Sequence, residues 1–306
     1  MTRAVVFAYH DVGVRCLSVL LSQGVHVSRV YTHSDDPNEN IWFGSVQTLA
    51  RSYGLPVTLV TRGDDPDLHA SVAAEQPDFL FSFYYRFMLP PALLALAKKG
   101  AYNMHGSLLP KYRGRVPINW AIIHGERETG ATLHEMVAKP DAGGIIDQQA
   151  VPILINDTAL DVFRKATVAA EMVLSRALPS LLDDTAKPRP QDLSAGGYFS
   201  GRKPDDGRID FSWSAGRIHN LIRAVAPPYP GAFCEVKGKR LDVLGTLWTA
   251  THSNTQGPPR LALHDGQMVL HCADGGLLHV SRANYDGHEL TPSNFNMRLG
   301  APSVPL

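Results

Sequence analysis

The sequence has few of the features that mark a disulfide-bonded, zinc-binding or membrane-spanning protein. It contains only three cysteines, Cys16, Cys234 and Cys272, and no two of them form a CxxC pair. Their wide spacing argues against a disulfide or zinc framework, and buried thiols in a reducing cytosol are the better interpretation. No apolar run approaches the ~20 residues that span a bilayer. With no signal-peptide pattern at the N-terminus, we expect a cytoplasmic protein that uses no membrane and no metal.

Neither sign of charge is in excess. The chain of 306 residues has 29 Lys and Arg residues and 29 Asp and Glu residues, so its formal net charge is zero. Proteins that grip a nucleic acid backbone usually carry a basic excess or a basic face, so a nucleic-acid partner is disfavoured. Hydrophobic residues make up 44% of the chain, an ordinary value for a globular enzyme. The length suits one large domain and a smaller one.

The glycine-rich fingerprint of dinucleotide binding is also missing. The first turn reads YHDVG at residues 9–13 instead of GxGxxG, so NAD binding is disfavoured. The surrounding pattern nevertheless alternates apolar strands with helices, which indicates a parallel sheet covered on both faces. Strands are predicted at 4–9, 25–31, 56–60 and 79–83, and helices after Asp11 and at 67–75 and 91–98. We predict a Rossmann-like, doubly wound α/β domain.

The rest of the chain divides at a stretch rich in Pro, Gly and small polar residues. Before this stretch the pattern predicts strands at 101–104, 131–136 and 145–153, and helices at 118–124 and 159–182. After it come a helix at 215–225 and short alternating segments, which favour a small β-barrel-like (OB-like) domain. We therefore predict a catalytic domain over 1–183, a linker over 184–204 and a β-rich domain over 205–306.

The densest cluster of unusual residues begins with Asn103 and His105, at the end of a predicted strand. Ligands bind at the carboxyl ends of parallel strands, and residues two apart on a strand point to one side. Asp141 lies in a second polar loop. An amide can stabilise a developing oxyanion, an imidazole can supply a proton, and a carboxylate can favour the charged imidazole. The three suit acyl transfer to an amine, although such residues in loops often only satisfy backbone groups.

The segment 103–148, NMHGSLLPKYRGRVPINWAIIHGERETGATLHEMVAKPDAGGIIDQ, resembles the core motif of the 10-formyltetrahydrofolate-dependent formyltransferases. That motif pairs Asn-x-His with a downstream Asp in a D-x-G loop, and both parts are intact here. The resemblance implies formyl transfer from 10-formyltetrahydrofolate as co-substrate, with no metal. It also implies that Asn103 stabilises the oxyanion, His105 donates or relays the proton, and Asp141 tunes His105.

Other segments resemble one particular branch of that family; they are FAYHDVG, YTHSDDPNEN, RKPDDGRIDF and YPGAF. This branch formylates UDP-4-amino-4-deoxy-L-arabinose during lipid A modification, which confers polymyxin resistance. The resemblance implies an amino-sugar nucleotide as acceptor. The familiar members of the branch carry a decarboxylase half, so we expect either a separate decarboxylase chain in the same pathway or a different pathway. A homo-oligomer is left open.

The resemblance also implies where the ligands bind. The pterin is expected to pack near Phe87, Met88 and Leu89, with Arg115 at the folate site and with the loop Val137, Ala138, Lys139, Pro140 and Asp141. Core packing is the alternative interpretation of residues 87–89.

For the acceptor, the candidates follow two predicted strands; they are His10, Asp11, Tyr84, Tyr85 and Arg86. Asp11 is equally well interpreted as a helix N-cap. His33, Asp35 and Asp36 have no metal-ligand spacing and are interpreted as a polar loop.

Several other functions share parts of this pattern. Methionyl-tRNA formyltransferase needs an RNA-binding surface, but residues 204–306 contain nine Lys and Arg residues against nine Asp and Glu residues, a poor balance for an RNA clamp. A binding module that has lost activity is disfavoured by the intact Asn103, His105 and Asp141. A hydrolase that releases formate would need water in the acceptor site. Another amino-sugar nucleotide as acceptor also remains an alternative.

Overall fold

The computed structural model describes residues 2–63, 65–252 and 257–306. The chain forms two compact units. The first comprises Met1–Pro117, Thr129–Val151 and Arg164–Ser200, and the second comprises Ile118–Glu128, Pro152–Phe163 and Gly201–Leu306. Residues 184–200 of the predicted linker lie within the first unit. The division at 183 and 204 stays a prediction.

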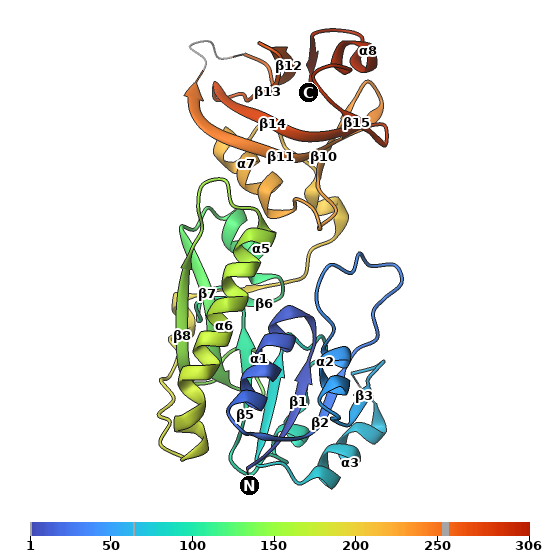
Figure 1. Cartoon of the computed structure of the whole chain (residues 1–306). Coiled ribbons are helices and arrows are strands. Elements are labelled where there is room, and N and C mark those ends of the chain that lie inside the picture. The colour runs from blue at the N-terminus through green and yellow to red at the C-terminus, as the bar shows by residue number, and fades with distance from the viewer. Residues whose placement is uncertain (1, 64, 253–256) are drawn as a thin grey trace. The chain divides into compact units, whose positions relative to one another are not determined.

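A seven-stranded sheet forms the centre of the first unit, in the order β3-β2-β1-β4-β5-β7-β8 (Figure 1). The strands are β1 (Arg3–Ala8), β2 (His26–Thr32), β3 (Val57–Leu59), β4 (Phe79–Phe83), β5 (Gly100–His105), β7 (Glu128–Glu135) and β8 (Ile145–Pro152). The pairs from β3 through to β5 are all parallel. The prediction of a Rossmann-like α/β fold with a parallel central sheet is confirmed.

The sheet departs from the fully parallel prediction at β7, which runs antiparallel to β5. A parallel strand needs a crossover that returns the chain to the opposite end of the sheet, usually through a long helix. Between β5 and β7 the only helix is α5 (Pro117–Ile123), of 7 residues. The chain therefore re-enters the sheet from the end at which it left.

Helices cover both faces of the sheet, because successive strand residues point to opposite sides. Gly13 of α1 (His10–Ser22) lies close to Ala8 of β1 and to Val46 of α2 (Val46–Ser52), because a Cβ added at Gly13 would contact both residues. Helices α1 and α2 therefore lie on one face of the sheet. On the other face, Leu68 and Val72 of α3 (Pro66–Glu75) and Leu93 of α4 (Pro91–Leu94) join a buried cluster with strand residues. This is the doubly wound arrangement.

Two local predictions can be compared directly with the helices. The helix predicted over 159–182 matches α6 (Ala159–Leu182). The helix predicted over 91–98 ends at Leu94, because the N–H groups of Lys98 and Lys99 bond to the carbonyls of Pro77 and Asp78 beside β4. Those N–H groups are then no longer available to continue the helix.

A two-stranded parallel sheet, β6 (Arg113–Gly114) with β9 (Tyr198–Phe199), also belongs to the first unit. Both strands are too short to be recognised from sequence patterns, and β9 lies inside the predicted linker. A 3₁₀ turn, Leu193–Ala195, precedes β9.

The second unit is built on a curled antiparallel sheet in the order β10-β11-β14-β13-β12-β16. Its elements are a 3₁₀ turn (Pro204–Gly207), α7 (Ala215–Ala224), β10 (Ala232–Val236), β11 (Lys239–His252), β12 (Arg260–His264), β13 (Gln267–His271), β14 (Gly276–Tyr285), β15 (His288–Leu290), α8 (Phe295–Leu299) and β16 (Ser303–Pro305). Ser214 caps α7 by accepting the Arg217 N–H. Apolar side chains of both helices, such as Ile218 and Phe295, pack into the core of the sheet.

None of the helices that the structure describes combines the length and the apolar character needed to cross a membrane.

Candidate active site

The site begins at the carboxyl end of β5, between β4 and β7. Asn103 and His105 lie on this strand, and the antiparallel register with β7 places them opposite His134 and Thr132. The His105 side chain is buried, with 6% of its surface exposed. Because the two residues are separated by one position, the pleat directs both toward the same side of the sheet, as predicted.

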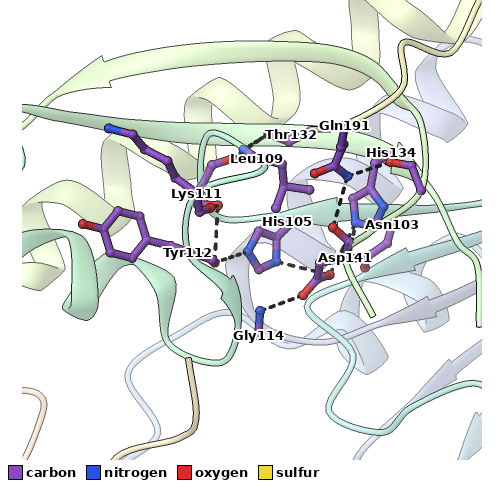
Figure 2. A network of polar contacts seen from close by, with 12 residues as sticks. Asn103, His105, Leu109, Lys111, Tyr112, Gly114, Thr132, His134, Asp141 and Gln191 are labelled. Atoms are coloured by element: carbon purple, nitrogen blue, oxygen red, sulfur yellow. Dashed lines mark hydrogen bonds and ion pairs between the residues drawn. The ribbon is translucent and has the colours of Figure 1, made fainter. Parts of the chain in front are cut away.

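Asp141 reaches this strand end from the loop between β7 and β8 (Figure 2). Its Oδ2 accepts a hydrogen bond from the Gly114 N–H at 2.8 Å. Its Oδ1 lies 3.6 Å from His105 Nδ1 and 3.5 Å from His134 Nε2. The backbone of Asp141 is left-handed, with φ at 52°, which an Asp tolerates better than most residues. The carboxylate therefore faces both imidazoles.

The surroundings of Asp141 hold the pKa of its carboxyl well below the usual range. Burial by itself raises this pKa, but the charge of His105, the hydrogen bond and charge of His134, and the Gly114 N–H together outweigh it. Asp141 is therefore ionised at physiological pH. Because the folded pKa is the lower one, the ionised carboxylate contributes stability above the ordinary carboxyl range. That contribution is lost as the pH falls through the folded value.

His105 is held from its other side by the loop that follows β5. Its Nε2 lies 2.8 Å from the Tyr112 carbonyl oxygen, so this nitrogen carries a hydrogen and donates it. The Nδ1 atom then faces the Asp141 carboxylate, so a proton on Nδ1 would lie against a negative charge. Both ring nitrogens thus face oxygen acceptors, and the ring is placed to hold or pass a proton at Nδ1.

The loop itself is braced by side chains of β7 and β8. Thr132 Oγ1 donates to the Ser107 carbonyl at 2.6 Å and accepts the Leu109 N–H at 3.2 Å. Gln148 donates to the Leu109 carbonyl at 2.8 Å. Ser107 Oγ donates to the Lys111 carbonyl at 2.6 Å. These buried contacts fix the Tyr112 carbonyl that receives the His105 hydrogen bond.

His134 fixes the orientation of Asn103. Its Nδ1 lies 2.7 Å from the Glu135 carbonyl and must donate. Its Nε2 lies 3.2 Å from Asn103 Nδ2 and 3.5 Å from Asp141 Oδ1. In the neutral ring this nitrogen accepts from the Asn103 amide, whereas in the protonated ring, the form that lowers the pKa of Asp141, it donates to the carboxylate. The amide nitrogen has two hydrogens, and His134 takes one of them. The second is left for a ligand.

The predicted folate residues divide between the core and the surface. Leu89 is buried in the cluster beneath the sheet, and Phe87 packs against the same cluster with Met136. Met88 and Val137 are exposed large apolar side chains, at 60% and 44%. Ala138, Lys139 and Arg115 are exposed, and Pro140 is partly buried. The 87–89 segment and the residue before the 137–141 loop, Met136, thus pack on the same core cluster. Each segment also exposes one large apolar side chain, Met88 or Val137.

Among the predicted acceptor residues, His10 and Tyr84 lie together, with ring centroids 6.3 Å apart. His10 stacks on Phe43 at 3.8 Å and meets the edge of Trp42 at 4.6 Å. Burial, followed by the charge of Arg86, lowers the pKa of His10 to about 3. His10 is therefore neutral at physiological pH and brings no positive charge to an anionic ligand.

Asp11 lies in the first turn of α1, whose N-cap is Tyr9, so the interpretation of Asp11 as the N-cap is wrong by two positions. The helix starts earlier because the Gly13 N–H already bonds to the Tyr9 carbonyl at 3.2 Å, although the backbone of His10 is left-handed, with φ at 68°. The Asp11 carboxylate instead accepts the Gly44 N–H at 2.7 Å. This bond ties the loop that carries Trp42 and Phe43 to α1.

Tyr85 and Arg86 pack against residues other than His10. Tyr85 stacks on His33 with ring centroids 4.3 Å apart. Arg86 lies over the Tyr9 ring at 4.6 Å and pairs with Glu39 through Nη1 at 2.8 Å. His33, interpreted from the sequence as part of a polar loop, is buried: its Nε2 accepts the Arg86 N–H at 3.1 Å. Aromatic packing explains the burial of this histidine.

Tyr84 lies between the aromatic residues around His10 and the catalytic candidates on β5. A Cβ added at Gly106 would lie 2.0 Å from the Tyr84 hydroxyl oxygen, so this hydroxyl touches the backbone immediately after His105. The backbone of Tyr84 is left-handed, with φ at 56°. The aromatic cluster of His10, Trp42, Phe43 and Tyr84 therefore adjoins the catalytic candidates.

Family models match both units of the chain. The formyl transferase model matches residues 16–178, more than half of the chain, and the model of the formyl transferase C-terminal domain matches residues 202–299. The chain belongs to the formyl transferase family. It is therefore an enzyme that transfers a formyl group.

Solved structures of related enzymes have the same fold. An N-formyltransferase from Helicobacter canadensis, solved with folinic acid and dTDP-3-aminofucose, has a TM-score of 0.72 at 22% identity, over 92% of this chain and 99% of its own. WlaRD, a sugar 3N-formyl transferase solved with dTDP and 5-N-formyl-THF, has a TM-score of 0.71 at 20% identity, over 95% and 98%. HypX from Aquifex aeolicus, in complex with tetrahydrofolic acid, has a TM-score of 0.65 at 19% identity, over 96% of this chain and 46% of its own.

Two site residues of this formyl transferase have no distinct signal in the sequence. His134 contacts Asn103 and faces Asp141, but as a lone histidine on a strand it has no local mark. Gln191 donates to the Asp141 and Gly143 carbonyls from within the predicted linker. Only the strand register and the path of the 184–200 segment bring them to the site. Across the described residues, no group of three His, Cys, Asp or Glu side chains is arranged to hold a metal ion.

Proposed function

We propose that this formyl transferase moves the formyl group of 10-formyltetrahydrofolate to the amine of a sugar nucleotide, UDP-4-amino-4-deoxy-L-arabinose being the first candidate. One observation carries the proposal. Asn103 and His105 lie on β5 and Asp141 lies in the loop between β7 and β8, yet the Asp141 carboxylate lies 3.6 Å from His105, and His134 contacts both Asp141 and Asn103. An amide donor, an imidazole and an ionised carboxylate are thus collected at one strand end.

Each of the three side chains has a role that follows from its contacts. When an amine attacks the formyl carbon, negative charge develops on the formyl oxygen, and the second hydrogen of the Asn103 amide can stabilise that charge. His105 holds or passes a proton at Nδ1, which the departing nitrogen needs and the attacking amine must lose. Asp141 stabilises the imidazolium form of His105, because its own carboxyl stays ionised.

The folate supplies the formyl group when it is bound. The chain's own residues fit such a group, because two exposed apolar side chains, Met88 and Val137, flank segments that share one core cluster. A flat pterin would cover such side chains and remove their apolar surface from water. We assign the folate to Phe87, Met88 and Arg115 and to the 137–141 loop. Leu89 supports this site from the core.

The aromatic cluster of His10, Trp42, Phe43 and Tyr84 is the proposed acceptor site. Flat rings stack on nucleobases regardless of sequence, and Tyr84 touches the backbone next to His105. The Helicobacter canadensis N-formyltransferase was solved with dTDP-3-aminofucose, an amino-sugar nucleotide, and WlaRD, a sugar 3N-formyl transferase, was solved with dTDP. A cytoplasmic location and a decarboxylase on a separate chain remain predictions of the same proposal.

The acceptor is tested by incubating the protein with 10-formyltetrahydrofolate and one amine at a time. The panel contains UDP-4-amino-4-deoxy-L-arabinose, other amino-sugar nucleotides, and methionyl-tRNA. We expect release of tetrahydrofolate, followed by absorbance, to depend on an amino-sugar nucleotide, and mass spectrometry to find one added formyl group on it. Transfer to methionyl-tRNA alone would contradict the proposed acceptor. Release of formate without any acceptor would indicate a hydrolase instead.

A further inference from the structure

The segment 189–199, which the sequence places in a linker, is bonded to both loops that hold the catalytic candidates. At its start, Arg189 and Ile145 exchange two backbone hydrogen bonds of 2.8 Å each. At its end, β9 pairs with β6, where the Arg113 N–H donates to the Gly197 carbonyl at 3.0 Å and the Arg115 N–H to the Phe199 carbonyl at 2.9 Å. The segment therefore joins the loop of Asp141 to the loop that follows His105.

Side chains strengthen the attachment to β6. The guanidinium of Arg113 is buried and donates from Nη2 to the carbonyls of Leu193 and Gly196, at 3.0 Å each. The ring of Tyr112 stacks on Phe199 with centroids 5.2 Å apart. The Tyr112 carbonyl, immediately before β6, receives the His105 hydrogen bond, and the Gly114 N–H of β6 donates to Asp141. The backbone partners of both catalytic candidates thus depend on this segment.

Gln191 completes the ring of contacts on the side of Asp141 (Figure 2). Its Nε2 donates to the Asp141 carbonyl at 3.1 Å and to the Gly143 carbonyl at 2.6 Å. Turning the amide over would set its oxygen against two carbonyl oxygens, so the orientation is fixed. Its Oε1 is buried with no hydrogen-bond partner among the described residues. A buried amide oxygen without a hydrogen-bond partner is uncommon in folded proteins and calls for an explanation.

The loop that carries Asp141 and Gly143 is also confined on the side that faces β7. A Cβ added at Gly143 would lie 2.1 Å from the Glu135 carbonyl oxygen, so the loop packs tightly on β7. Asp141 itself is in the left-handed region, which an L-residue leaves readily unless its surroundings hold it there. The two bonds from Gln191 flank this residue and hold its peptide.

We propose that Gln191 is a positioning residue for formyl transfer: by holding the backbone of Asp141 and Gly143, it directs the Asp141 carboxylate at His105 and His134. The inference rests on the proposed function for its catalytic consequence. Gln191 itself touches no reacting atom. Its effect passes through Asp141 and the 189–199 segment.

The test is Gln191→Met, which keeps the length of the side chain and removes both donors. Gln23→Met is the matched control, because Gln23 Nε2 also donates to a backbone carbonyl, that of Ser175, far along the chain from the site residues. We expect kcat to fall by about 100-fold in Gln191→Met, as for a misplaced catalytic group. The KM for the acceptor should stay within about twofold, because the proposed acceptor cluster does not include the 137–141 loop. Gln23→Met should match the wild type in kcat.

A second readout does not depend on the acceptor. Carbon-13 NMR of the Asp141 carboxyl, assigned with Asp141→Asn, reports its pKa directly. His105 on β5 and His134 on β7 face this carboxylate, the Gly114 N–H bonds to it, and Glu135 packs beside the loop at Gly144. Loss of the aligned histidines should raise the pKa of Asp141 in Gln191→Met toward its ordinary value. Gln23→Met should leave it low.

The outcomes separate the two proposals. A wild-type kcat together with an unchanged Asp141 pKa in Gln191→Met would overturn the positioning role. So would a loss of kcat that follows a loss of melting temperature with the Asp141 pKa unchanged, since that pattern is merely structural. If the wild type transferred no formyl group to any acceptor, the proposed function would fail, and the Asp141 titration would still decide the role of Gln191.

Discussion

Replacing His105 with alanine is expected to lower kcat for formyl transfer by about 100- to 10,000-fold, the range for loss of a positioned acid–base group. The His105 imidazole faces the ionised Asp141 carboxylate through Nδ1 and is placed to hold a proton there. Steady-state release of tetrahydrofolate measures the loss. His69→Ala, an exposed histidine on α3, is the matched control and should retain wild-type kcat.

The folded state must survive for this result to count. His105 is buried and bonded to the Tyr112 carbonyl, so circular dichroism and the melting temperature should accompany the kinetics. A folded His105→Ala protein with near wild-type turnover would remove His105 from the mechanism.

Replacing Asn103 with alanine is the second large expected effect. Removing an oxyanion donor costs about 100- to 1,000-fold in kcat, and the Asn103 amide has one hydrogen left for that role after its contact with His134. The change should lower kcat and kcat/KM equally, because the interaction forms only as negative charge develops. Asn103→Asp should be at least as slow, because a carboxylate of the same shape repels the charge that the amide stabilises.

Asn296→Ala on α8 is a suitable control, because this asparagine is exposed in the second unit. A rise in KM with unchanged kcat for Asn103→Ala would contradict the oxyanion role. It would mean that Asn103 only binds substrate in the ground state.

The fold was largely predictable because its main signals are local. Strand Phe79–Phe83 is a continuous apolar run, and helix Ala159–Leu182 shows a clear stripe at helical spacing; both match β4 and α6. Signals of this kind need no knowledge of distant partners. The antiparallel β7 was not predictable in the same way, because strand direction depends on how the chain returns to the sheet.

The candidate site shows the same division. Asn103 and His105 could be paired from the sequence, because residues two apart on one strand share a side. Asp141 joins them from a separate loop: its residue type suggested the grouping, and the family motif supported it. His134 lies opposite Asn103 through the β5–β7 register, a long-range property that composition does not encode.

The contacts of the 189–199 segment could not be predicted from its composition, for a physical reason. Its Pro, Gly and small polar residues are typical of linkers, yet its glycines permit close packing. A Cβ added at Gly196 would lie 2.0 Å from the Pro110 carbonyl oxygen, so the glycine is needed for this contact. Gln191 sits in the same stretch, where a polar side chain is expected to face solvent.

The most direct test of the central claim is the coupling between His105 and Asp141 in one kinetic cycle. The values of kcat for His105→Ala, Asp141→Asn and the double variant are compared with the wild type under one set of conditions. If the two side chains act as one unit, the double variant should be within about threefold of the slower single variant. Losses that multiply in the double variant would mean that the two side chains act independently, and would contradict the account.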